Sequence, residues 1–215
     1  MIVADIHANL FALRAVFEAA PAYDALLCLG NIVGYGAHPN GCCDELQKRG
    51  ALCVAGNHDA AAIGHAIGEC FNAIARASTQ WTQSVLTPQS RAFLEVLPLH
   101  FASEEWQLQA VHGSLVQPLE EYIQGIHSAR PTWAKMRFDL CFFGHTHRAA
   151  SLSELNVPGR RYETEVRDWK DGGTFSPRGD GWKTLGFVSQ PCDSNPSPAS
   201  IQAPAPSNSS PSPTM

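Results

Sequence analysis

Side chains that can hold a metal ion follow five separate apolar segments of the sequence, each directly after the segment ends. They are Asp5 with His7, Asn31, Asn57 with His58, His112, and His145 with His147. Imidazole, amide and carboxylate groups without a thiolate suit Mn²⁺, Fe, Zn²⁺ or Ni²⁺, and they disfavour a structural zinc site. An imidazole also titrates at about pH 6.5, so a histidine among these groups is suited to general acid catalysis.

Short apolar runs predict the strands that position these side chains. Strands are expected at residues 2–4, 25–29, 51–55, 106–111 and 140–143, each ending at a small residue or a turn. In open α/β sheets, ligands bind beyond the carboxyl ends of the strands, so five polar strand ends indicate one shared site. Residues 148–190 contain short β-prone runs without a helical pattern, which suggests returning antiparallel strands. The class is α/β, with a mixed sheet or two stacked sheets.

Helices are predicted between these strands. Apolar residues recur at helical spacing from Leu10, and Pro21 stops that helix. A second helix is expected from Pro39 to Gly50. A third, amphipathic helix carries Phe71, Ile74, Ser78, Trp81 and Val85 along one face. Thr87 and Pro88 form an N-cap and first-turn pair for a fourth helix.

The chain of 215 residues corresponds to one domain with an additional segment. After Asp193 the sequence has no charged residue and is dominated by Pro, Ser, Ala and Asn. We therefore expect one folded domain over residues 1–199 and a disordered tail over residues 200–215. Only three residues separate Met1 from Asp5, which is short for a central strand and suggests that the natural chain begins further upstream.

Composition restricts the partners and the location of the protein. The net charge is −5 and there is no cluster of Lys and Arg, so specific nucleic-acid binding is not expected. No apolar run is long enough to span a membrane, and the first ten residues do not resemble a signal peptide. The seven cysteines contain no C-x-x-C pair and mostly lie in apolar runs, as free thiols do in a reducing cytoplasm. We expect a soluble cytoplasmic protein whose oligomeric state the sequence leaves open.

The five motifs, in this order, resemble those of the calcineurin-like metallophosphoesterase superfamily, and closely its small bacterial phosphodiesterase branch. That family carries D-x-H, G-D, G-N-H-D/E, a single H often followed by G, and G-H-x-H. The match runs over residues 2–148 and includes the stretch Val33-Gly34-Tyr35-Gly36. A partial match continues over residues 186–191, where this chain has G-F-V-S-Q-P and the family has a closing G-S-V-G-Q-P strand. The motif set is specific for the superfamily and much less specific for a substrate.

The resemblance implies a fold and a metal site. The fold would be a four-layer αββα sandwich with two mixed β-sheets and with two divalent cations at the carboxyl-terminal ends of the strands. By the motifs, one cation would be bound by Asp5, His7 and His147 and the other by Asn57, His112 and His145, with position 31 bridging both. His58 would be the general acid near the leaving group. Asp59 either orients His58 or stabilises the N-terminus of the following helix, and the second role is favoured.

The resemblance also implies a reaction. The protein would be a metal-dependent phosphoesterase that hydrolyses a small phosphodiester or phosphomonoester. Two cations about 3.5–4 Å apart would neutralise the phosphate, activate a bridging hydroxide and stabilise the attacking and leaving oxygens. Mn²⁺ is expected first, with Fe, Zn²⁺ or Ni²⁺ as alternatives.

Asn31 departs from the family, which has Asp at this position. Two divalent ions about 3.5 Å apart repel each other by about 19 kcal/mol at an effective dielectric of about 20. A bridging carboxylate counters this repulsion with a full negative charge, whereas an amide oxygen offers only a dipole. We therefore predict incomplete occupancy of the dinuclear site and reduced activity. Together with the degraded end at Phe187, Ser189 and Cys192, Asn31 also favours an alternative, a catalytically impaired regulatory module that binds metal or phosphate.

Overall fold

The computed structural model describes residues 1–66, 71–155, 163–168 and 182–187. Its strands are β1 (Ile2–Val3), β2 (Leu27–Cys28), β3 (Leu52–Cys53), β4 (His100–Ser103), β5 (Leu108–Val111), β6 (Leu140–Phe143), β7 (Ala150–Leu155), β8 (Glu163–Asp168) and β9 (Trp182–Phe187). Its helices are α1 (Leu10–Ala19), α2 (Pro39–Lys48), α3 (Asn57–Ala62), α4 (Ala73–Val85), α5 (Pro88–Glu95) and α6 (Ile126–Lys135). The predicted tail over residues 200–215, the domain boundary at 199, and Ser189 and Cys192 lie outside the described residues.

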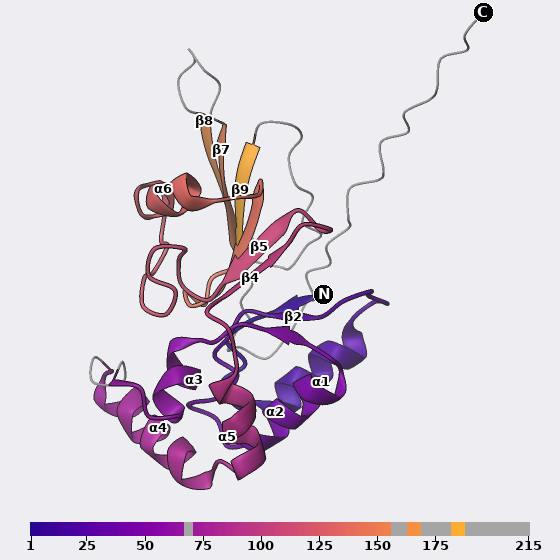
Figure 1. The fold of residues 1–215 in the computed structure, drawn as a ribbon, viewed down its shortest axis with the longest axis vertical. Coiled ribbons are helices and arrows are strands. Elements are labelled where there is room, and N and C mark those ends of the chain that lie inside the picture. The colour runs from indigo at the N-terminus through magenta and orange to yellow at the C-terminus, as the bar shows by residue number, and fades with distance from the viewer. Residues whose placement is uncertain (67–70, 156–162, 169–181, 188–215) are drawn as a thin grey trace, which may run out of the picture.

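The strands form two sheets. β1, β2 and β3 pair in parallel in the smaller sheet, and the larger sheet has the order β4-β5-β6-β9-β7-β8. In the larger sheet, β5, β6 and β9 run parallel, whereas β4 and β7 pair with their neighbours in the antiparallel direction. Figure 1 shows α1 to α5 on one side of the smaller sheet, and the larger sheet with α6 on the other side. The predicted α/β class with two stacked sheets is confirmed.

Three apolar layers hold the four structural layers together. Val3, Cys28 and Cys53 pack against α1, α2 and α5 in the first apolar layer. Ile2 and Leu27 point to the opposite face of the smaller sheet, where they meet the larger sheet. This separation follows from the period of two in a strand, which sends successive side chains to opposite faces.

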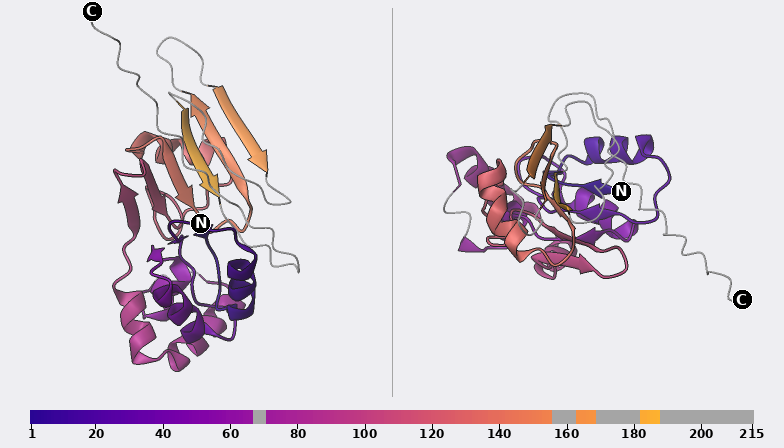
Figure 2. Two further views of the ribbon diagram at one scale, coloured as in Figure 1. Left: turned by 90° about the vertical axis from the view of Figure 1, so that its right-hand side faces the viewer. Right: turned by 90° about the horizontal axis from the view of Figure 1, so that it is seen from above.

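The larger sheet repeats the same alternation. Ala110 and Phe142 face the smaller sheet, whereas Val111 and Phe143 pack on the other face. That outer face is covered by α6 through the fully buried Trp133. Figure 2 shows α6 lying along this sheet from two further directions. The order of layers is therefore helices, small sheet, large sheet and helix, the four-layer αββα sandwich that the resemblance implies.

The helix boundaries agree with most of the signals in the sequence. α2 begins at Pro39, and α5 begins at Pro88 after Thr87, whose side chain accepts a hydrogen bond of 3.1 Å from the backbone of Ser90. The Asn9 side chain caps α1 by accepting from Ala12 at 3.1 Å. Each cap satisfies a backbone N–H that has no partner within its helix.

Three features of the fold differ from the sequence predictions. The predicted apolar face of α4 is wrong, since Ile74 and Trp81 are exposed while Thr79 and Thr82 are buried. Thr82 tolerates burial because its hydroxyl donates to the carbonyl of Ser78 at 2.9 Å. In addition, the sequence pattern does not predict β4 or α6. α6 contains Pro131 and lacks a clear apolar period, so its sequence gives little helical signal.

Within the described part of the chain, no helix has the length and apolar character needed to cross a lipid bilayer.

The contact between the two sheets can be tested at Phe142, which is 1% exposed. We expect Phe142→Ala to lower the free energy of unfolding by about 3–5 kcal/mol, because it leaves a cavity between the sheets. The matched control is Phe11→Ala, at a side chain that is 70% exposed, with an expected change within about 0.5 kcal/mol. Urea unfolding followed by circular dichroism measures both, and equal effects would contradict the layer assignment.

Candidate metal centre

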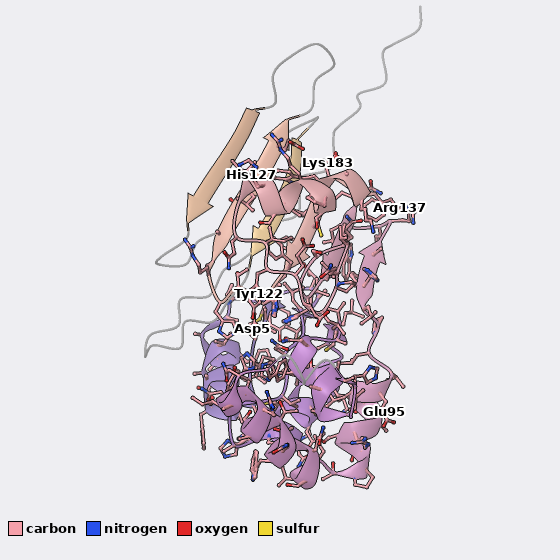
Figure 3. All side chains as sticks on the ribbon, turned by 90° about the vertical axis from the view of Figure 1, so that its left-hand side faces the viewer. Asp5, Glu95, Tyr122, His127, Arg137 and Lys183 are labelled. Carbon is pink, nitrogen blue, oxygen red and sulfur yellow. The ribbon has the colours of Figure 1, made fainter. Side chains whose placement is uncertain are left out.

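The structure brings all the candidate site residues to one edge of the two sheets. Asp5 and His7 follow β1, Asn31 follows β2, and Asn57 and His58 begin α3 just after β3. From the larger sheet, His112 follows β5, and His145 and His147 follow β6. Figure 3 shows Asp5 at the level where the N-terminal helical half meets the C-terminal sheet. The shared site predicted from five strand ends therefore has a geometric basis, although the role of each residue stays a prediction.

Asp5, His7 and His147 form the first set of facing ligand atoms. One oxygen or nitrogen from each residue lies within 4.8 Å of the others. Nε2 of His7 is 3.1 Å from Nε2 of His147, and Oδ1 of Asp5 is 3.5 Å from Nε2 of His147. Nδ1 of His7 lies 3.3 Å from the carbonyl oxygen of Val33. This carbonyl accepts a hydrogen bond from Nδ1, so the lone pair of the ring is on Nε2.

Asn57, His112 and His145 form the second set. Nε2 of His112 is 3.2 Å from Oδ1 of Asn57 and 3.1 Å from Nδ1 of His145. The other nitrogen of His112 donates to the carbonyl of Leu29 at 2.7 Å, and the other nitrogen of His145 lies 3.3 Å from the carbonyl of Glu120. Nε2 of His112 therefore directs its lone pair between the Asn57 oxygen and Nδ1 of His145. Acceptor atoms this close to Nε2 of His112 repel it unless a cation lies between them, so the set fits a divalent ion.

The protonation states of Asp5, His7 and His145 also fit cation binding. Burial opposes ionisation of Asp5, but the hydrogen bond with His147 and the charges of His112 and other histidines hold its pKa at about 2. Burial lowers the pKa of His7 to about 3, against the charge of Asp5, and burial with the nearby His112 lowers that of His145 to about 3. The hydrogen bond with Asp5 raises the pKa of His147. Metal binding requires a carboxylate with neutral imidazoles, which is the form of Asp5, His7 and His145, whereas a cation must displace the proton that Asp5 favours on His147.

Several candidate ligands adopt a backbone conformation that L-residues avoid. The φ angles are +53° at Asp5, +48° at His7, +54° at Asn31, +67° at His145 and +54° at His147. Left-handed backbone costs about 1–2 kcal/mol per non-glycine residue and concentrates at functional sites. The strain lets each side chain turn inward immediately after its strand ends.

Asn31 is held between Asp5 and His58. Its Oδ1 accepts from the backbone N–H of His58 at 2.9 Å, and its Nδ2 donates to Oδ1 of Asp5 at 3.1 Å. Reversing the amide would set its NH₂ group against the His58 N–H, so the donor group must face Asp5. Gly56 makes room for this arrangement, since a Cβ at that position would lie 2.3 Å from Oδ1 of Asn31.

His58 lines the same cavity as the ligands, and its ring centroid is 4.9 Å from that of His7. Asp59 does not orient it. The two carboxylate oxygens of Asp59 instead accept from the backbone N–H groups of Val33, at 3.0 Å, and Gly56, at 2.9 Å. The favoured role of Asp59, stabilising the N-terminus of α3, agrees with these contacts. Burial raises the pKa of Asp59 to about 7, against the backbone N–H groups that favour its charged form.

A cavity of about 190 Å³ opens on the two ligand sets. Besides candidate residues it is lined by Tyr35, Tyr122 and Thr146. The Tyr122 ring stacks on His145, with 3.7 Å between centroids and 22° between planes, and Phe71 stacks on His58 at 4.5 Å. Tyr35 belongs to the stretch that carries the family resemblance, and Tyr122 has no signal in the sequence. The sequence places Phe71 on the face of the third predicted helix, whereas in the structure it precedes α4 and contacts His58. Figure 3 labels Tyr122 beside Asp5.

Comparison with known proteins identifies the family. The model of the calcineurin-like phosphoesterases matches residues 1–149, which is more than half of the chain and includes every strand end described above. The chain belongs to the calcineurin-like phosphoesterase family. This family uses divalent metal ions, and the carboxylate, amide and imidazole groups at the strand ends are suitable ligands for such ions.

Individual relatives of this chain agree. It is 38% identical over 155 residues to an uncharacterized protein of Methanocaldococcus jannaschii, an alignment that covers 68% of this chain and 61% of that protein. The chain thus spans about three fifths of the length of this curated relative. The crystal structure of a metallophosphoesterase from Sphaerobacter thermophilus superimposes with a TM-score of 0.71 and 32% identity, over 90% of this chain and 78% of that one.

A more distant structure shares only the fold. It is a hypothetical protein of Pyrococcus horikoshii OT3, with a TM-score of 0.59 and 13% identity, covering 79% of this chain and 88% of that one.

Metal binding by this chain can be measured as stabilisation. At Mn²⁺ concentrations about 100 times the Kd, the free energy of unfolding should rise by about 2.7 kcal/mol over the EDTA-treated protein. His147→Ala and His112→Ala should each reduce this increment, because each removes a ligand from one set. His127→Ala, at an exposed histidine of α6, should leave it unchanged. Thermal unfolding with added Mn²⁺ gives the increments, and an equal increment in all the proteins would argue against this centre.

Proposed function

We propose that this chain hydrolyses a small phosphodiester or phosphomonoester and that it uses two divalent cations, Mn²⁺ first and Fe, Zn²⁺ or Ni²⁺ as alternatives. The observation that carries the proposal is the close approach of acceptor atoms of Asn57 and His145 to Nε2 of His112, beside the set of Asp5, His7 and His147. His58 lies in the same cavity, within reach of a bound ester. The five described cysteines are free and buried, which supports our prediction of a cytoplasmic protein.

The residues divide the work of the reaction. When bound, the two cations neutralise the phosphate and supply a nucleophile at neutral pH. Asp5, His7 and His147 hold one cation, and Asn57, His112 and His145 hold the other. The carbonyls of Val33, Leu29 and Glu120 keep three of the four imidazoles in the required tautomer.

His58 supplies the proton for the departing alkoxide. Its Nδ1 is buried without a hydrogen-bond partner among the described residues, and buried unpaired N–H groups are rare, so the proton belongs on Nε2. Before substrate binds, burial and the charges of His112 and His145 lower the pKa of His58 to about 4. A bound phosphate anion opposes this shift, because a nearby negative charge favours the imidazolium.

The orientation of Asn31 favours the second candidate function, a module that binds metal or phosphate with impaired catalysis. The amide directs an NH₂ group toward Oδ1 of Asp5, the oxygen that also faces His147. Asp5 is then the only carboxylate among the candidate ligands. Two divalent cations would be held with one negative charge fewer than an aspartate at position 31 would provide.

Hydrolysis of bis-p-nitrophenyl phosphate with added Mn²⁺ separates the two functions. We expect turnover by the unmodified chain and a loss of about 10²- to 10⁴-fold in kcat for His58→Ala, the usual contribution of a general acid. His65→Ala, at an exposed histidine, is the matched control and should retain kcat. No turnover by any of the three proteins, despite bound Mn²⁺, would favour the binding module.

Asn31→Asp tests the effect of the missing charge. The substitution replaces the donor beside Asp5 with a carboxylate, so we expect more Mn²⁺ per chain after dialysis and a higher kcat with the same ester. Metal analysis by mass spectrometry gives the first quantity and steady-state kinetics the second. Unchanged values of both would refute the proposed role of position 31.

A further inference from the structure

Two half-exposed tyrosines border the mouth of the cavity. Tyr35 is 46% exposed and Tyr122 is 50% exposed, and both line the cavity above the candidate ligands. One face of the Tyr122 ring rests on His145, and the exposed half of the residue is accessible to a molecule bound in the cavity. The Tyr35 ring lies 4.7 Å from the His58 ring and 4.9 Å from the His7 ring, between centroids. We refer to Tyr35 and Tyr122 together as the aromatic rim.

The backbone at Tyr35 suggests that its side chain has a functional role. Its φ is +59°, and it stands between Gly34, at +90°, and Gly36. A glycine would adopt this conformation without strain, whereas a tyrosine does so at a cost. Burial in the core does not recover that cost, since nearly half of the ring is exposed. Strained residues with exposed side chains at a site mouth are candidates for substrate contact.

Tyr122 is held in place by the segment before it. Gly113 donates to the carbonyl of Pro118 at 2.6 Å, and the Ser114 hydroxyl contacts the Glu121 carboxylate. The carbonyl of Glu120 faces a ring nitrogen of His145 at 3.3 Å, next to the stacked Tyr122 ring. The ring is therefore oriented before a ligand arrives, which reduces the entropy lost on binding.

The size of the cavity places part of the substrate on this rim. Its volume of about 190 Å³ is below the range of about 300–1,000 Å³ that encloses most small ligands. Cations and a phosphoryl group would occupy much of that volume. A substituent bonded to the phosphate must then lie at the mouth, against Tyr35 and Tyr122.

We propose that the aromatic rim binds a planar aromatic group attached close to phosphorus, so that the preferred substrate is an aryl-type phosphate ester rather than a small alkyl ester. This inference rests on the proposed function, since it assumes that the phosphoryl group lies at the two ligand sets. Aromatic rings favour stacked or edge-to-face partners. The exposed half of Tyr122 offers the first geometry, and Tyr35 adds a second ring beside His58, where the leaving group departs.

Binding of two phosphonates tests the proposal without requiring turnover. Phenylphosphonate and methylphosphonate carry the same anionic head, and their P–C bonds are not hydrolysed. Isothermal titration calorimetry on the Mn²⁺-loaded full chain should give a lower Kd for phenylphosphonate. Tyr122→Leu and Tyr35→Leu should each reduce the ratio of the two Kd values by about 2- to 12-fold, the range expected for one aromatic pair. Tyr122→Phe should keep the ratio, because it keeps the ring.

Trp106→Leu is the matched control, since Trp106 is 39% exposed but does not line the cavity, and it should leave the ratio unchanged. Equal Kd values for the two phosphonates, or binding of neither, would overturn the proposal. The proposal would also be overturned if Tyr122→Leu and Tyr35→Leu weakened the binding of both phosphonates equally. The two rings would then affect binding only by positioning His145 and His58, without contacting the phenyl group. If the chain bound phenylphosphonate more tightly than methylphosphonate but hydrolysed no ester, the proposed function would be refuted. The binding of an aromatic group at the aromatic rim would still be supported.

Discussion

The buried Asp5 carboxylate is hydrogen-bonded to both halves of the fold. Its Oδ2 accepts from the backbone N–H of His145, which follows a strand of the larger sheet, at 2.9 Å. Its Oδ1 accepts from the Asn31 amide, which follows a strand of the smaller sheet, at 3.1 Å. Gly144 permits the approach, since a Cβ there would lie 3.0 Å from both Oδ2 of Asp5 and Cβ of Ala4. Burying a carboxylate is costly, and these bonds, with a cation, offset the cost.

This one contact explains why the two sheets place their functional side chains within a single cavity. Stacked sheets held only by apolar residues such as Ile2 and Phe142 would tolerate a shift at their edges, because apolar contacts are not directional. The hydrogen bonds of Asp5 are directional and fix the end of β1 against the end of β6. His7 and His147, on either side, then direct their ring nitrogens toward each other at 3.1 Å.

Much of the site could be predicted because each motif comes directly after an apolar run, and this order holds even where the exact ends of the strands differ from the prediction. The left-handed turn at His145 lies within a motif and needs no distant information. Tyr122 could not be found in this way, because its position depends on hydrogen bonds within residues 113–121 that leave no period in the sequence. α4 was assigned the wrong buried face for a related reason. Apolar spacing alone does not reveal that Thr82 can satisfy its hydroxyl within the helix.

Asn31 shows how structure changes the meaning of a substitution that the sequence already identifies. From the sequence, an amide in place of a carboxylate is a weaker ligand with an oxygen still available to a cation. In the fold, the backbone N–H of His58 donates to that oxygen and fixes the amide with its NH₂ group toward Asp5. The amide then donates to Asp5, so it competes with a cation for the same carboxylate oxygen. Asn31 therefore weakens metal binding in two ways. It lacks the negative charge of an aspartate, and it adds a hydrogen-bond donor that competes with a cation for Asp5.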